Sequence, residues 1–161
     1  MLLTLFWIGY IPKFSGTIAS FVTCLFFYIL WFFFGVKNII EIYIVILILI
    51  FLCSVPIINK IYKDKDSKEI VIDEFIGQNI PLLAWYNSDI NSSELFYKFN
   101  LNLYSLEVWI LCSFVLFRFF DILKPFPISF VDNKIKNGFG VIFDDVLAGI
   151  FSTVILYMVF V

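Results

Sequence analysis

Two long apolar runs, Thr17–Phe34 and Ile39–Ile58, constrain this chain more than any other feature of its sequence. Between them they contain one charged residue, Glu41. Each run is close to the roughly 20 residues that an α-helix needs to cross the hydrocarbon core of a bilayer. Because lipid offers no hydrogen-bond partner to an exposed backbone, such a segment is stable there as a helix. The two runs therefore predict an integral membrane protein.

Three further apolar segments extend this pattern and are expected as helices: Ile70–Tyr86, Leu101–Phe120 and Val141–Val161. Hydrophobic residues make up 62% of the chain, far above their usual share in soluble proteins. We therefore expect a single domain over residues 1–161, folded as an all-α, polytopic membrane bundle of four to five apolar helices. The segment Met1–Tyr10 is too short to cross a bilayer, so we expect an interfacial or a re-entrant segment.

The distribution of lysines predicts how this bundle is oriented. Four lysines lie between Asn59 and Glu69, and lysine-rich loops stay on the cytoplasmic side of a membrane. The loop Asn87–Asn100 contains one lysine and suits the outer side. Five helices with the N-terminus inside then bring every acidic motif to the cytoplasmic face. This arrangement keeps carboxylates away from the midplane, where each would cost roughly 3 kcal/mol.

Three separate apolar segments carry acidic residues at that face: Asp73, Glu74, Asp121, Asp144 and Asp145. Carboxylates held together near a dry membrane boundary repel one another, and a hard divalent cation offsets this repulsion. Ligation by oxygen alone favours Mg²⁺ or Mn²⁺ over zinc. All five residues are therefore candidate metal ligands and catalytic groups. Gly77 and Gly149 each follow an acid by four residues, and their missing side chains would let a helix or a ligand approach closely.

Basic groups and a helix start are expected beside these acids. Arg118 is three residues from Asp121, so the two share a helix face, and Pro125 ends that helix next to Lys124. A helix that starts near Ser15 or Thr17 presents free N–H groups that attract anions. The candidate ligands for a phosphate group are thus Arg118, Lys124, Thr17, Ser15 and Lys13. A metal with basic groups is the minimum for phosphoryl transfer.

The residue types that are absent or scattered exclude several classes of function. The chain has no histidine, which excludes phosphohistidine chemistry, a Ser-His-Asp triad and His-ligated zinc. Cys24, Cys53 and Cys112 lie in apolar runs without paired or metal spacing, so we expect small apolar side chains and no disulfide. A net charge of −2 without a basic patch argues against nucleic-acid binding.

Four motifs carry a resemblance to a known family: GYIPKFSGTIAS at Gly9–Ser20, IVIDEFIG at Ile70–Gly77, FRFFDILKPFPI at Phe117–Ile128 and DDVLAG at Asp144–Gly149. In this order they resemble the phosphatidylglycerophosphatase A family of bacterial membrane phosphatases. Ser15 stands where members of that family often have proline.

The resemblance implies Mg²⁺-dependent hydrolysis of the phosphate monoester of phosphatidylglycerophosphate, a phospholipid, to phosphatidylglycerol and inorganic phosphate. It also implies a place in the bacterial cytoplasmic membrane. The site residues that it implies are Asp73 with Glu74, the element Arg118, Asp121, Lys124 and Pro125, and Asp144 with Asp145.

Other interpretations stay open beside this one. The chain could be a non-enzymatic membrane protein that binds or transports divalent cations, because intramembrane carboxylates also mark ion pathways. A pathway would distribute its acids through the membrane depth, whereas this sequence groups them at one end. A lipid phosphotransferase would release a nucleotide instead of phosphate, and we find no motif for that class. The sequence does not decide whether water attacks the phosphate directly or a phosphoenzyme forms. It does not decide the oligomeric state either.

Overall fold

The computed structural model describes residues 3–11, 13–34, 40–61, 69–87 and 106–160. Within these ranges the chain is helical, which confirms the all-α class. The helices are α1 (Ser15–Phe34), α2 (Ile40–Ile61), α3 (Ile72–Leu83), α5 (Leu106–Leu123), α6 (Ile128–Lys134) and α7 (Gly138–Phe160), with short 3-10 segments η1 (Ile8–Tyr10) and η3 (Ala84–Asn87). Most of the lysine-rich loop and of the predicted outer loop lies outside the described residues.

Three of the described helices, α1, α2 and α7, are long and apolar enough to cross a membrane. This is fewer than the four to five that we expected. The third expected span is shorter than predicted, because α3 has 12 residues, or about 18 Å of helix. The fourth, α5, has 18 residues and carries Glu107, Arg118 and Asp121.

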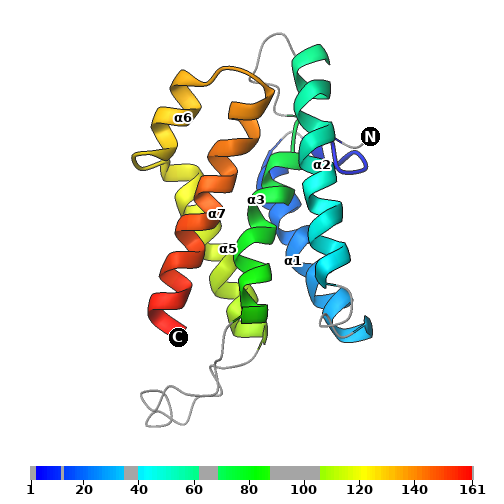
Figure 1. Cartoon of the computed structure of the whole chain (residues 1–161), viewed down its shortest axis with the longest axis vertical. Coiled ribbons are helices and arrows are strands. Elements are labelled where there is room, and N and C mark those ends of the chain that lie inside the picture. The colour runs from blue at the N-terminus through cyan, green and yellow to red at the C-terminus, as the bar shows by residue number, and fades with distance from the viewer. Residues whose placement is uncertain (1–2, 12, 35–39, 62–68, 88–105, 161) are drawn as a thin grey trace.

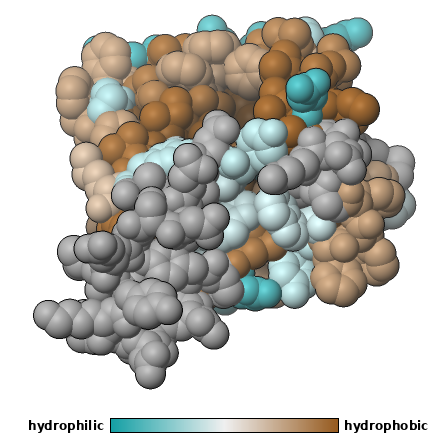
Figure 2. Space-filling view, turned by 60° about the horizontal axis from the view of Figure 1, so that its bottom comes forward, coloured by the Kyte–Doolittle hydropathy of each residue, from teal (hydrophilic) through white to brown (hydrophobic). Residues whose placement is uncertain are grey.

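The outer surface of the bundle is rich in exposed apolar side chains, and brown, hydrophobic atoms cover much of the face in Figure 2. Phe32 on α1, Ile42 on α2 and Met158 on α7 are among the exposed apolar residues. Such a surface would be unfavourable in water and suits contact with lipid tails.

Helix α3 lies inside the bundle and packs against α1, α2, α5 and α7 (Figure 1). Because protein surrounds it, α3 does not need the length or the apolar surface of a membrane span. Three side-chain hydrogen bonds join α3 and η3 to their neighbours: Tyr43 Oη to Asn79 Oδ1 (2.6 Å), Trp109 Nε1 to Pro81 O (2.8 Å) and Tyr157 Oη to Ala84 O (2.9 Å).

The starts of α1, α3 and α7 and the end of α5 lie at the same end of the bundle, away from the C-terminus (Figure 1). Helix α5 ends at Leu123, as the proline at position 125 predicts. The connector that follows contains α6, which we did not expect. The side chain of Asn59 at the end of α2 accepts a hydrogen bond from Gly138 N (2.6 Å) and so fixes the start of α7.

The N-terminal segment lies beside the chain that leads into α3. Val71 N donates a hydrogen bond to Leu3 O (3.0 Å), and Leu3 is buried. Phe6, Trp7 and Tyr10 of the same segment are exposed. An anchored backbone with exposed aromatic side chains suits the interfacial one of the two locations expected for Met1–Tyr10.

Candidate active site

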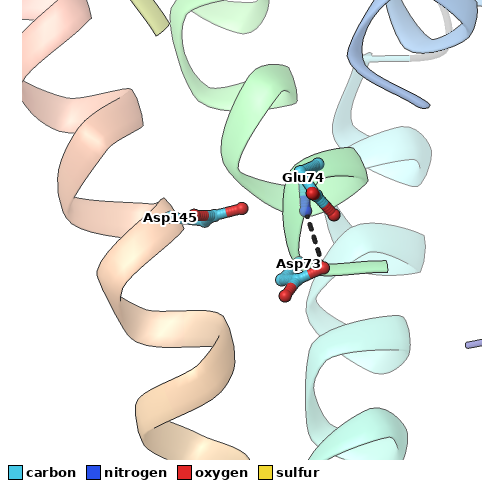
Figure 3. A group of neighbouring side chains, drawn as sticks. All are labelled: Asp73, Glu74 and Asp145. Carbon is cyan, nitrogen blue, oxygen red and sulfur yellow. Dashed lines mark hydrogen bonds between the residues drawn. The ribbon is translucent and has the colours of Figure 1, made fainter. Parts of the chain in front are cut away.

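Three carboxylates meet where the first turn of α3 faces α7. One oxygen each from Asp73, Glu74 and Asp145 lies within 4.8 Å of the others. Asp145 is buried and points from α7 toward the start of α3, while Asp73 and Glu74 are half-buried (Figure 3). Asp73 Oδ1 accepts a hydrogen bond from Glu74 N (3.1 Å), which fixes its side chain. We call these three residues the acidic trio.

The acidic trio concentrates negative charge in a largely buried position. Burial raises the pKa of Asp73 well above its usual range, and the neighbouring charge of Glu74 raises it further. Glu74 Oε2 is buried and has no hydrogen-bond partner within the described ranges. An unpartnered buried carboxylate oxygen beside two other acids is unfavourable unless a positive charge is added. Oxygen ligands of this kind suit a hard divalent ion.

Arg118 and Asp121 form an ion pair on α5, with Arg118 Nη1 2.5 Å from Asp121 Oδ2. Their spacing of three residues produces this contact, as expected. Arg118 Nε is buried and lacks a hydrogen-bond partner among the described residues. The guanidinium therefore has a donor available for a further acceptor.

The first turn of α1 packs directly against Glu74 and Arg118. A Cβ atom on Gly16 would overlap the Glu74 carboxylate and lie 3.3 Å from Arg118 Nη1. Glycine at this position therefore allows α1 to approach both side chains. Ser15 and Thr17, on either side of Gly16, are half-buried at the same helix start. The free N–H groups of this turn add positive potential beside the acids.

Lys124 bridges two other acids at the same end of the bundle. Its Nζ donates to Asp132 Oδ1 of α6 (2.7 Å) and to Asp144 Oδ2 of α7 (2.6 Å). Burial lowers the pKa of Lys124, but the two carboxylates outweigh this effect, so the pKa is raised and the ammonium form is favoured. Asp144 is buried, and its Oδ1 has no hydrogen-bond partner among the described residues.

The structure divides the five predicted acids into groups. Asp73, Glu74 and Asp145 form the acidic trio, whereas Asp121 pairs with Arg118 and Asp144 pairs with Lys124. Thus Asp144 and Asp145, although adjacent, have different partners. The sequence had offered all five as metal ligands because it could not separate them.

Among the predicted phosphate ligands, Arg118 lies near Glu74 of the acidic trio, and Ser15 and Thr17 belong to the helix start beside both. Lys13 is exposed and forms no ion pair with a described acidic residue. Asp132 contacts Lys124, a role that sequence reasoning missed. The sequence alone assigns no function to Asp132, because no helix periodicity links it to Lys124 across the Pro125–Pro127 turn.

Comparisons with known proteins identify the family of this chain. A sequence model of the family described as Phosphatidylglycerophosphatase A matches residues 1–160. A phosphatidylglycerophosphatase A from Haemophilus influenzae is 36% identical over 128 residues, which is 74% of this chain and 65% of that protein. The matched region is therefore slightly less than two thirds of that relative. No solved structure matches the chain.

Two further relatives extend the comparison. A phosphatidylglycerophosphatase A from Escherichia coli is 30% identical over 154 residues, which is 94% of this chain and 77% of that protein. A Bacteroides thetaiotaomicron protein named as a candidate phosphatidylinositol-3-phosphatase is 35% identical over 92 residues, 57% of this chain and 48% of that protein. On the match over residues 1–160, this chain belongs to the phosphatidylglycerophosphatase A family.

Proposed function

We propose that this chain is a phosphatidylglycerophosphatase, which hydrolyses the terminal phosphate monoester of phosphatidylglycerophosphate to phosphatidylglycerol and inorganic phosphate. The observation that carries the proposal is the acidic trio with Arg118 beside it, at the end of an apolar helical bundle. When the bundle is in a membrane, this end lies at the level of the lipid headgroups. The names of the Haemophilus influenzae and Escherichia coli relatives support the choice of substrate.

We propose Mg²⁺ as the cofactor, with Asp73, Glu74 and Asp145 as its ligands. The donor set fits, since it consists of carboxylate oxygens within 4.8 Å of one another, and Glu74 Oε2 lacks a hydrogen-bond partner among the described residues. When bound, the ion would neutralise charge on the phosphate group and polarise its P–O bonds.

The basic residues and the α1 start would hold the phosphate oxygens. Arg118 and Lys124 can donate charge-assisted hydrogen bonds to them, and Ser15 and Thr17 can add hydroxyl donors. Holding the phosphate in this way would align its phosphorus with an attacking water, and positioning is a large part of phosphoryl-transfer catalysis.

In the proposed reaction, a water oxygen forms a bond to phosphorus while the bond from phosphorus to the glycerol oxygen breaks. One proton of the water passes to a carboxylate, which then delivers it to the glycerol oxygen and returns to its charged form. Asp121 and Asp144 are the candidate acceptors, because they are the predicted acids that lie outside the acidic trio.

The proposed location is the bacterial cytoplasmic membrane, with the site on the cytoplasmic face. Lys60, Lys124, Lys134 and Lys136 belong to the end of the bundle that carries the acids. An excess of lysine at one end supports a cytoplasmic assignment by the positive-inside rule.

A second candidate function is hydrolysis of a phosphoinositide, which also has a phosphate monoester on a lipid headgroup. The Bacteroides thetaiotaomicron relative is the observation that favours it. Both substrates would need the same phosphate ligands and would differ in the contacts of the headgroup alcohol. The alternative that is not an enzyme is a membrane protein that binds or transports divalent cations.

The test is phosphate release by the purified protein in detergent, with and without Mg²⁺, from phosphatidylglycerophosphate and from phosphatidylinositol 3-phosphate. The variant Asp145→Asn removes one member of the acidic trio. Glu107→Gln, at the opposite end of α5, is the matched control for loss of one acidic charge. We expect Mg²⁺-dependent release from phosphatidylglycerophosphate that is lost in Asp145→Asn and kept in Glu107→Gln.

The other outcomes separate the alternatives. Faster release from the inositol lipid would replace the proposed substrate and keep the reaction class. No release from folded protein with either lipid would refute the phosphatase assignment. Binding of Mn²⁺ by such an inactive protein, detected by electron paramagnetic resonance, would then favour the cation-binding alternative.

A further inference from the structure

Lys124 lies in the turn after α5, and carboxylates from α6 and α7 hold its ammonium group. Its Nζ lies 2.7 Å from Asp132 Oδ1 and 2.6 Å from Asp144 Oδ2. The two carboxylates differ in environment, because the Asp132 side chain is 43% exposed and that of Asp144 is 6% exposed. The buried carboxylate belongs to the helix that carries Asp145, and the exposed one belongs to the short helix α6.

A lysine ammonium has three N–H donors and no acceptor. The two carboxylates use two of these donors, so one N–H is left for another ligand. Because the three N–H bonds are arranged tetrahedrally, fixing two of them also fixes the direction of the third. With both acids in place, Lys124 therefore presents one oriented donor.

The backbone at Lys124 supports a functional reason for this placement. Its φ of 42° lies in the left-handed region, which disfavours residues with a Cβ atom. Lys124 N donates to Phe120 O (2.9 Å) just after the end of α5, a position where glycine is the usual residue. A lysine here tolerates the unfavourable backbone and keeps an ammonium group at this point. Strained residues of this kind concentrate at functional sites.

Without Asp132, the ammonium would have a different energy minimum. Asp144 Oδ1 is buried and has no hydrogen-bond partner among the described residues. An ammonium released by Asp132 could donate to both oxygens of Asp144, which would satisfy this atom. That movement would turn the remaining N–H away from its original direction.

We propose that Asp132 is a positioning residue that orients the free N–H of Lys124 toward a phosphate oxygen of the substrate. This inference rests on the proposed function, in which Lys124 is a phosphate ligand. The proposal makes α6 part of the active site, because this helix supplies the carboxylate that prevents the Lys124 ammonium from donating to both oxygens of Asp144. Asp132 itself touches neither substrate nor metal in this proposal.

The first experiment is a double-mutant cycle on phosphate release. Asp132→Asn keeps the size of the side chain and weakens its hold on the ammonium, and Lys124→Met removes the ammonium itself. We expect Asp132→Asn to lower kcat/KM about tenfold, the effect of losing one charge-assisted hydrogen bond, mainly through a higher KM. In the Lys124→Met background the same change should alter kcat/KM by less than about twofold, because the residue acts through Lys124.

Two further variants keep the result from being explained by a general loss of structure. Asp132→Glu retains a carboxylate and should recover part of the activity. Lys134→Gln changes the charge of α6 at an exposed residue away from Lys124, and its kinetics should match those of the unmodified protein. Wild-type kinetics in Asp132→Asn would overturn the proposal. A tenfold loss that persists in the Lys124→Met background would overturn it as well.

A second readout does not need turnover. Inorganic phosphate should raise the thermal midpoint of the wild-type protein in detergent, and this rise should disappear in Asp132→Asn and return in Asp132→Glu. A wild-type protein that binds phosphate but hydrolyses neither lipid would refute the proposed function and leave the role of Asp132 standing. An equal rise in wild type and Asp132→Asn would refute the role of Asp132 alone.

Discussion

The carbonyl oxygen of Gly77 on α3 lies so close to Gly149 on α7 that a Cβ atom on Gly149 would overlap it. Pro81, one turn further along α3, has no N–H and cannot donate the helical hydrogen bond to that carbonyl. On the other side of the contact, a Cβ on Gly77 would lie 2.6 Å from Asp145 O. The two helices therefore touch through their backbones, and this contact brings Asp145 next to Asp73.

We expect Gly149→Ala to separate α3 from α7, because the added methyl group meets backbone atoms that cannot rotate away. Overpacking of this kind costs about 1–3 kcal/mol of stability. The thermal midpoint and phosphate release should both fall. Val154→Ala, at an exposed residue of the same helix, is the control and should change neither. Unchanged activity in Gly149→Ala would mean that the site does not depend on this contact.

Gly16→Ala should separate activity from stability. The added Cβ meets the end of the Glu74 side chain, which can move, whereas alanine favours helix by up to about 1 kcal/mol over glycine. We expect a thermal midpoint equal to or above that of the wild type and a clear loss of phosphate release. The comparison is a melting curve beside an activity assay on the same sample. A fall in both quantities would show that the α1 start has a structural role instead.

The adjacent acids Asp144 and Asp145 should respond differently to substitution. Asp145→Asn removes a member of the acidic trio, so the Mg²⁺ concentration for half-maximal activity should rise by about tenfold or more. Asp144→Asn weakens the hold on Lys124 and removes a candidate proton acceptor, so it should instead raise the KM for the lipid and lower kcat. Mn²⁺ binding, followed by electron paramagnetic resonance, gives a readout independent of turnover. Equal loss of Mn²⁺ affinity in both variants would contradict this division.

Two neighbouring buried amides on α3 should have opposite effects on stability. Asn79 accepts a hydrogen bond from Tyr43 and donates one to Phe75 O, whereas neither polar atom of the Gln78 amide has a partner among the described residues. Gln78→Met should therefore keep or raise the thermal midpoint. Asn79→Leu should cost about 1–3 kcal/mol, because it leaves a buried hydroxyl unpaired. A lower midpoint in Gln78→Met would show that this amide has a partner in the folded protein.

Much of the fold follows from residue types and their order. Long apolar runs predict helices in lipid, since no other local structure satisfies its own backbone there. The proline at position 125 predicts the end of α5, and the spacing of Arg118 and Asp121 predicts their contact. The close approach at Gly77 and Gly149 was also expected from sequence and is confirmed. These features depend on interactions between residues that are near one another in the chain or on the lack of a side chain.

The remaining features depend on which surfaces face one another. Helix α3 is shorter than a membrane span and is surrounded by other helices, and its sequence does not distinguish lipid from protein as its neighbour. Adjacent residues on a helix point about 100° apart, so the packing of α7 against α3 decides that Asp145 joins the acidic trio and Asp144 takes Lys124. The pair of Lys124 and Asp132 arises only after the chain turns between α5 and α6. The sequence by itself determined the kinds of groups at the site, and the tertiary structure decided their partners.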